Sequence, residues 1–374
     1  MSCARGSALA VVAVLLGSCA HKWVELHPAA PLPEARWQHR AAYEPASNRL
    51  IVYSGKIPAT DFTTDVWVLE HANGLGGTPT WTKLAVPGAA PTARHMTSLA
   101  YDEANDRMII CGGHVDAPGA FSSDVWVLEH ATGVGGASAW TQLMPSGAPP
   151  AKREWHTAVY DGGSNRMTVF GGLAVGEGLV NDVWVLEHAN SLAGSPAWIR
   201  LAPSGAAPAR RAGHTAVFDR ANDRMIVFGG GNGSECPCLN DVWVLLHANG
   251  LGGTPEWVQL KPTGQAPINR EDHTAVYDGA TNRMIVFGGW RTEGPSAFYL
   301  NDVWVLKNAN GIGGAPEWVR MKTKGSPPSA RELASAVYDP GSGRMVVFGG
   351  SFAPVGPPTC GSGACANDLW LLKK

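Results

Sequence analysis

The segment NDVWVL at residues 181–186 recurs along this 374-residue chain and decides its fold. Its core DVWVL occurs five times and once more as DLWLL, with the tryptophan at Trp67, Trp126, Trp184, Trp243, Trp304 and Trp370. A second tryptophan follows 14 residues later in the first five copies, and a pair of glycines precedes the last five. Successive glycine pairs lie 58–61 residues apart. The chain is therefore a tandem array of one repeated unit.

Each unit predicts four short β-strands and no helix. In the fourth unit they are HTAVF (residues 214–218), MIVF (225–228), DVWVL (241–245) and WVQL (257–260), here called strands a to d. Strand b is apolar throughout, as expected of a strand that is covered on both faces. Six such sheets must stack on one another, and a closed ring of them is a β-propeller. The d–a and b–c loops then share one face, here called the top face.

The two ends of the chain predict how the ring closes. Unit six stops at Lys374, just after its strand c, whereas WVEL at residues 23–26 matches a strand d that no unit precedes. We expect residues 23–26 to supply strand d of blade six, so that residues 23–374 form one propeller. Trp23 would then lie on the bottom face.

The tandem glycines and the spaced aromatic residues resemble the kelch repeat over essentially all of residues 23–374. The Gly-His and Trp-Asp signatures of WD40 repeats are missing. The resemblance implies an all-β, six-bladed kelch-type propeller, blade six being closed by the N-terminal strand.

Composition excludes several classes of protein. Hydrophobic residues make up 45% of the chain and charged residues 16%, with 46 Gly, 27 Pro and 15 Trp. These values exclude a coiled coil, a disordered tail and a polytopic membrane protein. The net charge of −2 comes without a basic block, so we expect no nucleic-acid partner.

The first residues have the layout of a secretory signal, with Arg5 ahead of an apolar run at residues 8–16 that is too short to span a bilayer. The following Leu16-Gly17-Ser18-Cys19 resembles a bacterial lipobox. That resemblance implies a signal peptide at residues 1–18, lipidation of Cys19 and a linker at residues 19–22. It also implies an exported, membrane-anchored protein, in the outer membrane if the source is Gram-negative because Ala20 follows the cysteine. Ordinary cleavage near Ala20 is the alternative.

Four cysteines lie in loops of the expected exported domain, where disulfides persist. We expect a Cys360–Cys365 bridge and, with more ring strain, a Cys236–Cys238 bridge. A zinc site built from all four is the alternative.

Two residue types recur in all six units at positions that should meet on the top face. An arginine stands seven residues before the aromatic residue of strand a, at Arg36, Arg94, Arg153, Arg211, Arg270 and Arg331. An aspartate opens strand c, at Asp65, Asp124, Asp182, Asp241, Asp302 and Asp368. A residue present in every blade favours a scaffold role, so we expect structural ion pairs. A ring of arginines that binds an acidic peptide or a sugar carboxylate is the alternative. A histidine stands four residues before the aromatic residue in four of the six units, at His39, His156, His214 and His273, and we expect packing rather than a metal.

Residues that differ between blades are the candidates for ligand binding. Next to the recurring arginine we expect the channel mouth to be lined by Trp37, His95, Glu154, Trp155, Glu271, Asp272 and Glu332, with Trp290, Arg291 and Tyr299 in a b–c loop. Aromatic rings beside carboxylates suit a protein or glycan ligand. We therefore expect a monomeric, non-catalytic binding module without cofactor or metal, which contacts the membrane only through its anchor. The alternative, which rests on the likeness to six-bladed kelch mutarotases, is a carbohydrate-active enzyme using Glu154, Glu271 or Glu332.

Overall fold

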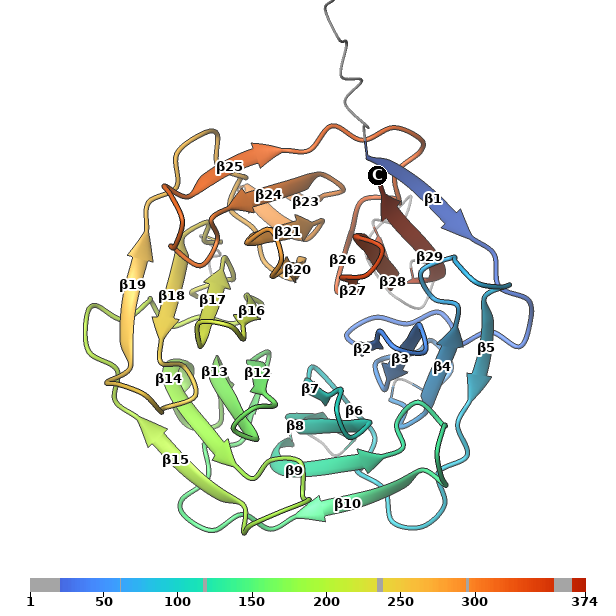
Figure 1. Cartoon of the computed structure of the whole chain (residues 1–374), viewed down its shortest axis with the longest axis horizontal. Helices are drawn as coiled ribbons and strands as arrows, with labels where there is room; N and C mark the ends of the chain where they lie inside the picture. Colours follow the sequence, from blue (N-terminus) through green and yellow to red (C-terminus); the bar gives the residue numbers. More distant parts are fainter. Residues whose placement is uncertain (1–20, 61, 117–119, 234–237, 294–295, 353–364) are drawn as a thin grey trace, which may run out of the picture.

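The computed structural model describes residues 21–60, 62–116, 120–233, 238–293, 296–352 and 365–374. Within these ranges every regular element is a β-strand, and six antiparallel sheets surround one axis (Figure 1). No helix in this part of the chain is long and apolar enough to cross a membrane. The all-β, six-bladed propeller predicted from the repeats is confirmed.

The strands of each blade follow one another from the axis to the rim. Strands a are β2 (Arg40–Glu44), β7 (Ser98–Asp102), β12 (Thr157–Asp161), β16 (Thr215–Asp219), β20 (Thr274–Asp278) and β27 (Ser335–Asp339). Strands b are β3 (Arg49–Tyr53), β8 (Arg107–Val115), β13 (Arg166–Ala174), β17 (Arg224–Phe228), β21 (Arg283–Phe287) and β28 (Arg344–Phe352). Strands c are β4 (Val66–Glu70), β9 (Phe121–Glu129), β14 (Gly178–Glu187), β18 (Val242–Leu246), β24 (Val303–Lys307) and β29 (Cys365–Lys373). Strands d are β5 (Thr80–Lys83), β10 (Ala139–Leu143), β15 (Ala197–Leu201), β19 (Glu256–Leu260), β25 (Glu317–Arg320) and β1 (Lys22–Leu26).

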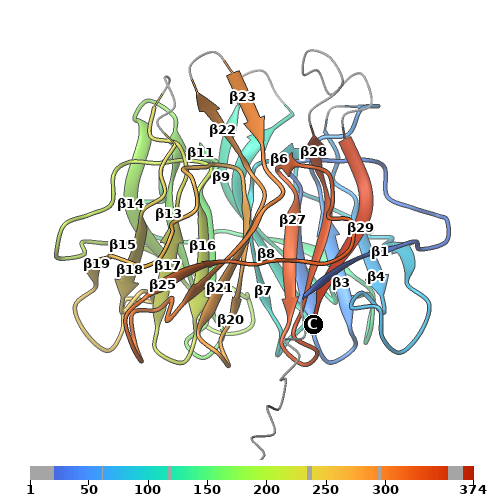
Figure 2. The same cartoon turned by 90° about the horizontal axis from the view of Figure 1, so that it is seen from above.

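Short additional strands lie on the top face. Three of them pair with the upper ends of β8, β13 and β28: these are β6 (Arg94–His95), β11 (Arg153–Glu154) and β26 (Arg331–Glu332). In blade five, β22 (Trp290–Glu293) and β23 (Ser296–Tyr299) form a separate hairpin, which stands above the other blades (Figure 2).

The N-terminal strand closes the ring as expected. β1 pairs antiparallel with β29 in a register that runs from Lys22 opposite Lys373 to Leu26 opposite Leu369. Blade six is thus assembled from both ends of the described chain, and its outer edge is paired rather than open.

Aromatic side chains hold neighbouring blades together. The tryptophan of a strand d packs on the phenylalanine of strand b in the preceding blade, as Trp257 does on Phe170 and Trp318 on Phe228, each with ring centroids 5.0 Å apart. Trp23 makes the same contact with Phe287 at 5.1 Å. Since strand b is covered on both sides, its apolar run forms the centre of each inter-blade core.

The glycine pair creates a bulge between strands b and c. In blade three the register of β13 with β14 shifts between Phe170 and Gly172, and Gly171 and Gly172 adopt φ of 66° and 99°. A Cβ on Gly172 would lie 2.6 Å from the carbonyl oxygen of Glu154. Glycine is required because the loop before strand a crosses the sheet here at backbone contact distance.

Candidate functional site

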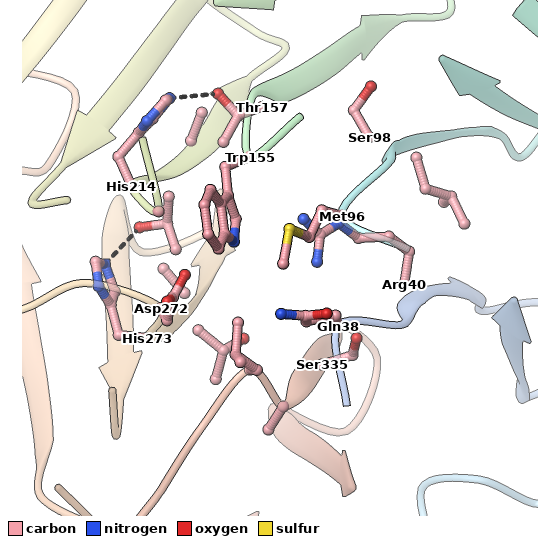
Figure 3. A pocket seen from close by; sticks show the side chains of 18 of the residues that line it. Gln38, Arg40, Met96, Ser98, Trp155, Thr157, His214, Asp272, His273 and Ser335 are labelled. Atoms are coloured by element: carbon pink, nitrogen blue, oxygen red, sulfur yellow. Dashed lines mark hydrogen bonds between the residues drawn. The ribbon is translucent and has the colours of Figure 1, made fainter. Parts of the chain in front are cut away.

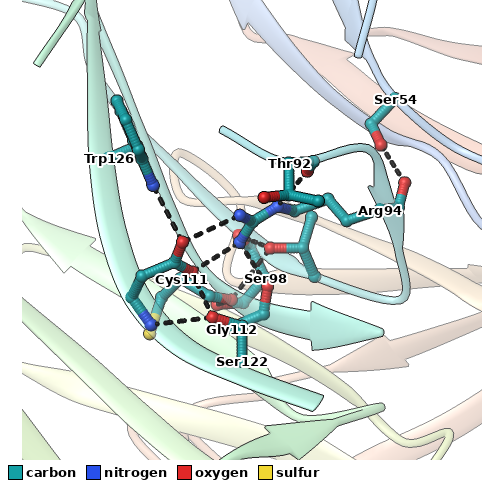
Figure 4. A network of polar contacts seen from close by, with 10 residues as sticks. Ser54, Thr92, Arg94, Ser98, Cys111, Gly112, Ser122 and Trp126 are labelled. Carbon is teal, nitrogen blue, oxygen red and sulfur yellow. Dashed lines mark hydrogen bonds and ion pairs between the residues drawn. The ribbon is translucent and has the colours of Figure 1, made fainter. Parts of the chain in front are cut away.

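A polar network that repeats in all six blades supports the top face. In blade two, the Arg94 guanidinium forms two hydrogen bonds with the Asp124 carboxylate, at 2.6 and 2.9 Å (Figure 4). Arg94 Nη1 also donates to the Gly112 carbonyl, and Trp126 Nε1 donates to the same carboxylate at 2.8 Å. The six arginine–aspartate pairs are Arg36–Asp65, Arg94–Asp124, Arg153–Asp182, Arg211–Asp241, Arg270–Asp302 and Arg331–Asp368.

These arginines belong to the scaffold. All six are 0–2% exposed, and each donates to two backbone carbonyls besides its aspartate. Burial raises the pKa of the Asp241 carboxyl, but the hydrogen bonds and charge of Arg211 outweigh that effect and leave the pKa below its usual range. With their donors engaged inside the blade, the guanidinium groups present no ring of free cations to a ligand.

A cavity of about 180 Å³ lies on the propeller axis, inside the top face (Figure 3). The residue five positions before each strand-a aromatic lines it, and this residue differs in every blade. The six are Gln38, Met96, Trp155, Gly213, Asp272 and Leu333.

All six of these residues have left-handed backbones, with φ between 52° and 63°. Backbone hydrogen bonds link them around the axis: Met96 N donates to Gln38 O at 3.3 Å, and Leu333 N donates to Asp272 O at 2.9 Å. Trp155, Gln38 and Asp272 donate likewise to the preceding blade. Side chains that rarely adopt positive φ are thus held there by inter-blade contacts, a form of strain that often marks functional sites.

Of the two neighbouring positions that we expected at the channel mouth, only the second lines this cavity in every blade. Trp37, His95, Glu154, Glu271 and Glu332 do not line the cavity. Their backbones pair with the extension of strand b, as in the bridges of Trp37 with Lys56 and of Glu271 with Trp290. The residue that follows each of them, such as Gln38 after Trp37, has the left-handed backbone, and only the side chain of this second residue points toward the axis.

None of the three candidate catalytic glutamates lines this cavity. Glu154 is 5% exposed, and its Oε2 lies 2.9 Å from His114 Nδ1, within the range of a hydrogen bond or an ion pair. Burial raises the pKa of Glu154, and the contact with His114 opposes that rise. Glu271 lies beside Asp272: burial, followed by the charge of Glu271, raises the pKa of Asp272 to about 7. Glu332 belongs to β26 in blade six.

The recurring histidines are packing residues in the described chain. His39, His156, His214 and His273 are 1–5% exposed, and burial lowers the pKa of each, aided by neighbouring arginines. His214 Nε2 shares a hydrogen bond with Thr157 Oγ1 at 2.9 Å, and His273 Nε2 with Thr215 Oγ1 at 2.8 Å. Among the described residues, no group of three or more His, Cys, Asp or Glu is arranged to hold a metal.

Sequence reasoning missed Arg40, which projects into the cavity (Figure 3). Three positions before the strand-a aromatic, the other five blades carry a small hydroxyl residue, namely Ser98, Thr157, Thr215, Thr274 and Ser335. A comparison of the repeats at this position would have identified Arg40 as the exception.

Two aromatic groups face each other across the axis on the top face. In blade five, the Arg291 guanidinium carbon lies 5.2 Å from the ring centroid of Phe298, whose side chain is 42% exposed. Trp290 and Tyr299 pair at the base of this hairpin, and Trp290 Nε1 donates to Asp272 Oδ2 at 3.4 Å.

The opposite group lies in blades one and two. The imidazoles of His95 and His114 stack with centroids 4.9 Å apart, and Phe62 stacks on His95 at the same distance. Lys56 Nζ lies 5.8 Å from the Trp37 ring centroid. Blade-specific aromatic and cationic side chains therefore flank the axial cavity on both sides.

Several predicted residues fall outside the described chain. They are Cys19, Cys236 and Cys360. Cys238 is buried and Cys365 begins β29. The expected bridges and lipidation therefore remain predictions.

Comparison with known proteins identifies the repeat. The KLHDC2/KLHL20/DRC7 Kelch-repeats domain matches residues 105–250 and 246–374. Acyl-CoA-binding domain-containing protein 4 of Arabidopsis thaliana is 26% identical over 94% of this chain and 47% of its own length. Human host cell factor 2 is 29% identical over 70% of this chain and 31% of its own length. The chain thus spans less than half the length of these two relatives.

The solved structure of YjhT has the same fold. It superimposes with a TM-score of 0.65 at 16% sequence identity, covering 92% of this chain and 97% of YjhT. Six blades, glycine-pair bulges and the matching domain model lead to one conclusion: the chain belongs to the kelch-repeat family.

Proposed function

We propose that this chain is a binding module that holds a partner protein on its top face, against the β22–β23 hairpin and the stacked His95–His114 pair. The observation that carries the proposal is the exposed Phe298 beside Arg291, on a hairpin that, among the described residues, forms a separate two-stranded sheet only in blade five. Aromatic and arginine side chains are the residue types enriched at protein-interface hot spots.

The kelch relatives support a protein partner. Their propellers, such as those of the host cell factors, point to a protein-interaction module. The recurring arginines are paired with aspartates of their own blades, so we expect blade-specific residues to recognise the partner. A glycan on the same aromatic surface is the competing outcome of the test below.

Photocrosslinking tests which face binds. A benzoylphenylalanine in place of Phe298 is expected to crosslink a partner protein, whereas the same group in place of Leu192, 48% exposed in a bottom c–d loop, should not. With the purified partner, Phe298→Ala or Arg291→Ala should weaken binding about tenfold or more. Equal crosslinking from both faces, or a captured glycan without protein, would refute the proposal.

We also propose that the module is exported and anchored through a lipidated Cys19, on the strength of the apolar run and Leu16-Gly17-Ser18-Cys19. The anchor would join the chain near Lys22, which pairs with Lys373 at the end of β29 in blade six. Cys19→Ser should abolish incorporation of a labelled fatty acid and move the protein from the membrane to the soluble fraction. Cys238→Ser is the matched control, and labelling that persists in Cys19→Ser would contradict the anchor.

A further inference from the structure

Arg40 carries the only blade-specific positive charge on the wall of the described axial cavity. Its Nε donates to the Thr97 carbonyl at 2.6 Å and its Nη1 to the His39 carbonyl at 3.2 Å. Among the described residues it forms no ion pair with a carboxylate, in contrast to the six scaffold arginines. The Asp272 carboxyl on the same wall acts on the Arg40 guanidinium through space, without a direct ion pair. Burying a guanidinium with so little compensation is costly, and an anion in the cavity would offset that cost.

The wall also contains polar atoms whose hydrogen-bonding capacity is unused. Gln38 is 7% exposed, and its Oε1 has no hydrogen-bond partner among the described residues. The same is true of Trp155 Nε1, on the facing side of the cavity (Figure 3). A ligand that satisfies them needs a donor for Gln38 and an acceptor for Trp155, in addition to an anion for Arg40.

Size limits the ligand further. The cavity volume of about 180 Å³ is below the range of roughly 300–1,000 Å³ that is usual for sites of drug-sized molecules. Ser98 and Thr274 add hydroxyl groups to the wall, so the surroundings suit a polar compound of a few carbon atoms.

We propose that the axial cavity binds a small hydroxycarboxylic acid, with its carboxylate on Arg40 and its hydroxyl groups on Gln38 Oε1 and the neighbouring polar wall. The site is separate from the protein-binding surface above it and does not depend on that assignment. Asp272, on the same wall, is partly protonated near neutral pH because burial and Glu271 raise its pKa to about 7. A half-neutral Asp272 cancels the Arg40 charge only in part.

Ligand-observed NMR titration of the full chain with glycerate tests the site. Glycerate is expected to bind, and glycerol, which lacks the charge, to bind much more weakly. Arg40→Thr should reduce glycerate affinity about tenfold or more, because a charge-assisted hydrogen bond is lost. This variant should fold, since threonine occupies the same position in blades three to five. Arg220→Thr removes an exposed arginine as the control and should leave the affinity unchanged.

A second variant keeps the charge and tests the hydroxyl contact. Gln38→Leu should reduce the preference for glycerate over propionate, and Leu333 shows that leucine is accommodated at this backbone position, with φ of 56°. No glycerate binding at millimolar concentrations, an unchanged affinity in Arg40→Thr, or phosphate binding as tightly as glycerate would each overturn the proposal.

Discussion

Replacing Trp23 by Ala is expected to lower the free energy of unfolding by about 3–5 kcal/mol, the usual cost of removing a buried tryptophan. Trp23 is 2% exposed, although it lies in the first described strand of the chain. Its ring contacts Phe287 of blade five, and its strand pairs with β29 over five residues. The substitution would open a cavity at the seam where the two ends of the chain meet.

We expect Trp23→Ala to lower the free energy of unfolding more than the same substitution of the tryptophan in another strand d. The other strands d are joined to their blades by a c–d loop, but β1 is held to β29 only by hydrogen bonds and packing. Detachment of β1 would expose the outer edge of blade six and would remove Trp23 from the core between blades five and six.

Urea denaturation followed by circular dichroism measures the effect. Trp290→Ala is the matched control, because Trp290 is partly exposed and lies on the hairpin outside the blade cores. A Trp23→Ala midpoint within error of the parent would show that β1 does not close the ring.

Replacing Asp241 by Asn is expected to cost about 3–5 kcal/mol, because it leaves a buried guanidinium without its counter-ion. Arg211 is 0% exposed and its Nη1 and Nη2 each lie 2.8 Å from the Asp241 carboxylate. Asn can still accept the hydrogen bond from Trp243 Nε1, but its NH2 group would then face a donor of Arg211, so one hydrogen bond is lost together with the charge. Glu103→Gln is the control, because its contact with Arg220 is half-exposed and 4.0 Å long, and it should change stability by less than about 1 kcal/mol.

The same pair has a defined pH dependence. The folded-state pKa of Asp241 lies below its value in the unfolded chain. The pair therefore contributes fully above the unfolded-state pKa of about 3.9, and its contribution falls as the pH drops through the folded-state value. Unfolding free energies at pH 7 and pH 3 should show a smaller acid loss for Asp241→Asn than for the parent. Equal acid losses would indicate that Asp241 does not carry this linkage.

The architecture could be predicted because it depends on what repeats. Periodic Trp, Gly pairs and apolar strands determined the number of blades, and the unmatched WVEL determined that residues 23–26 complete blade six. The repeat also led us to expect that each arginine meets its aspartate, and the atoms lie 2.6–2.8 Å apart in all six blades. The local sequence pattern is sufficient here because the same unit forms the same blade, with the same contacts, six times.

The candidate site could be predicted only in part, because it depends on what does not repeat. The sequence by itself identified Trp155 and Asp272 as blade-specific, but it grouped them with Trp37 and Glu154, which do not line the cavity. Only the tertiary structure shows which of two adjacent residues, such as Glu154 and Trp155, lines the cavity. Inter-blade hydrogen bonds hold one backbone position at positive φ, and that conformation directs one side chain of each pair to the axis. The same holds for Arg40, whose isolation among hydroxyl residues appears only when six strands from distant parts of the chain surround one axis.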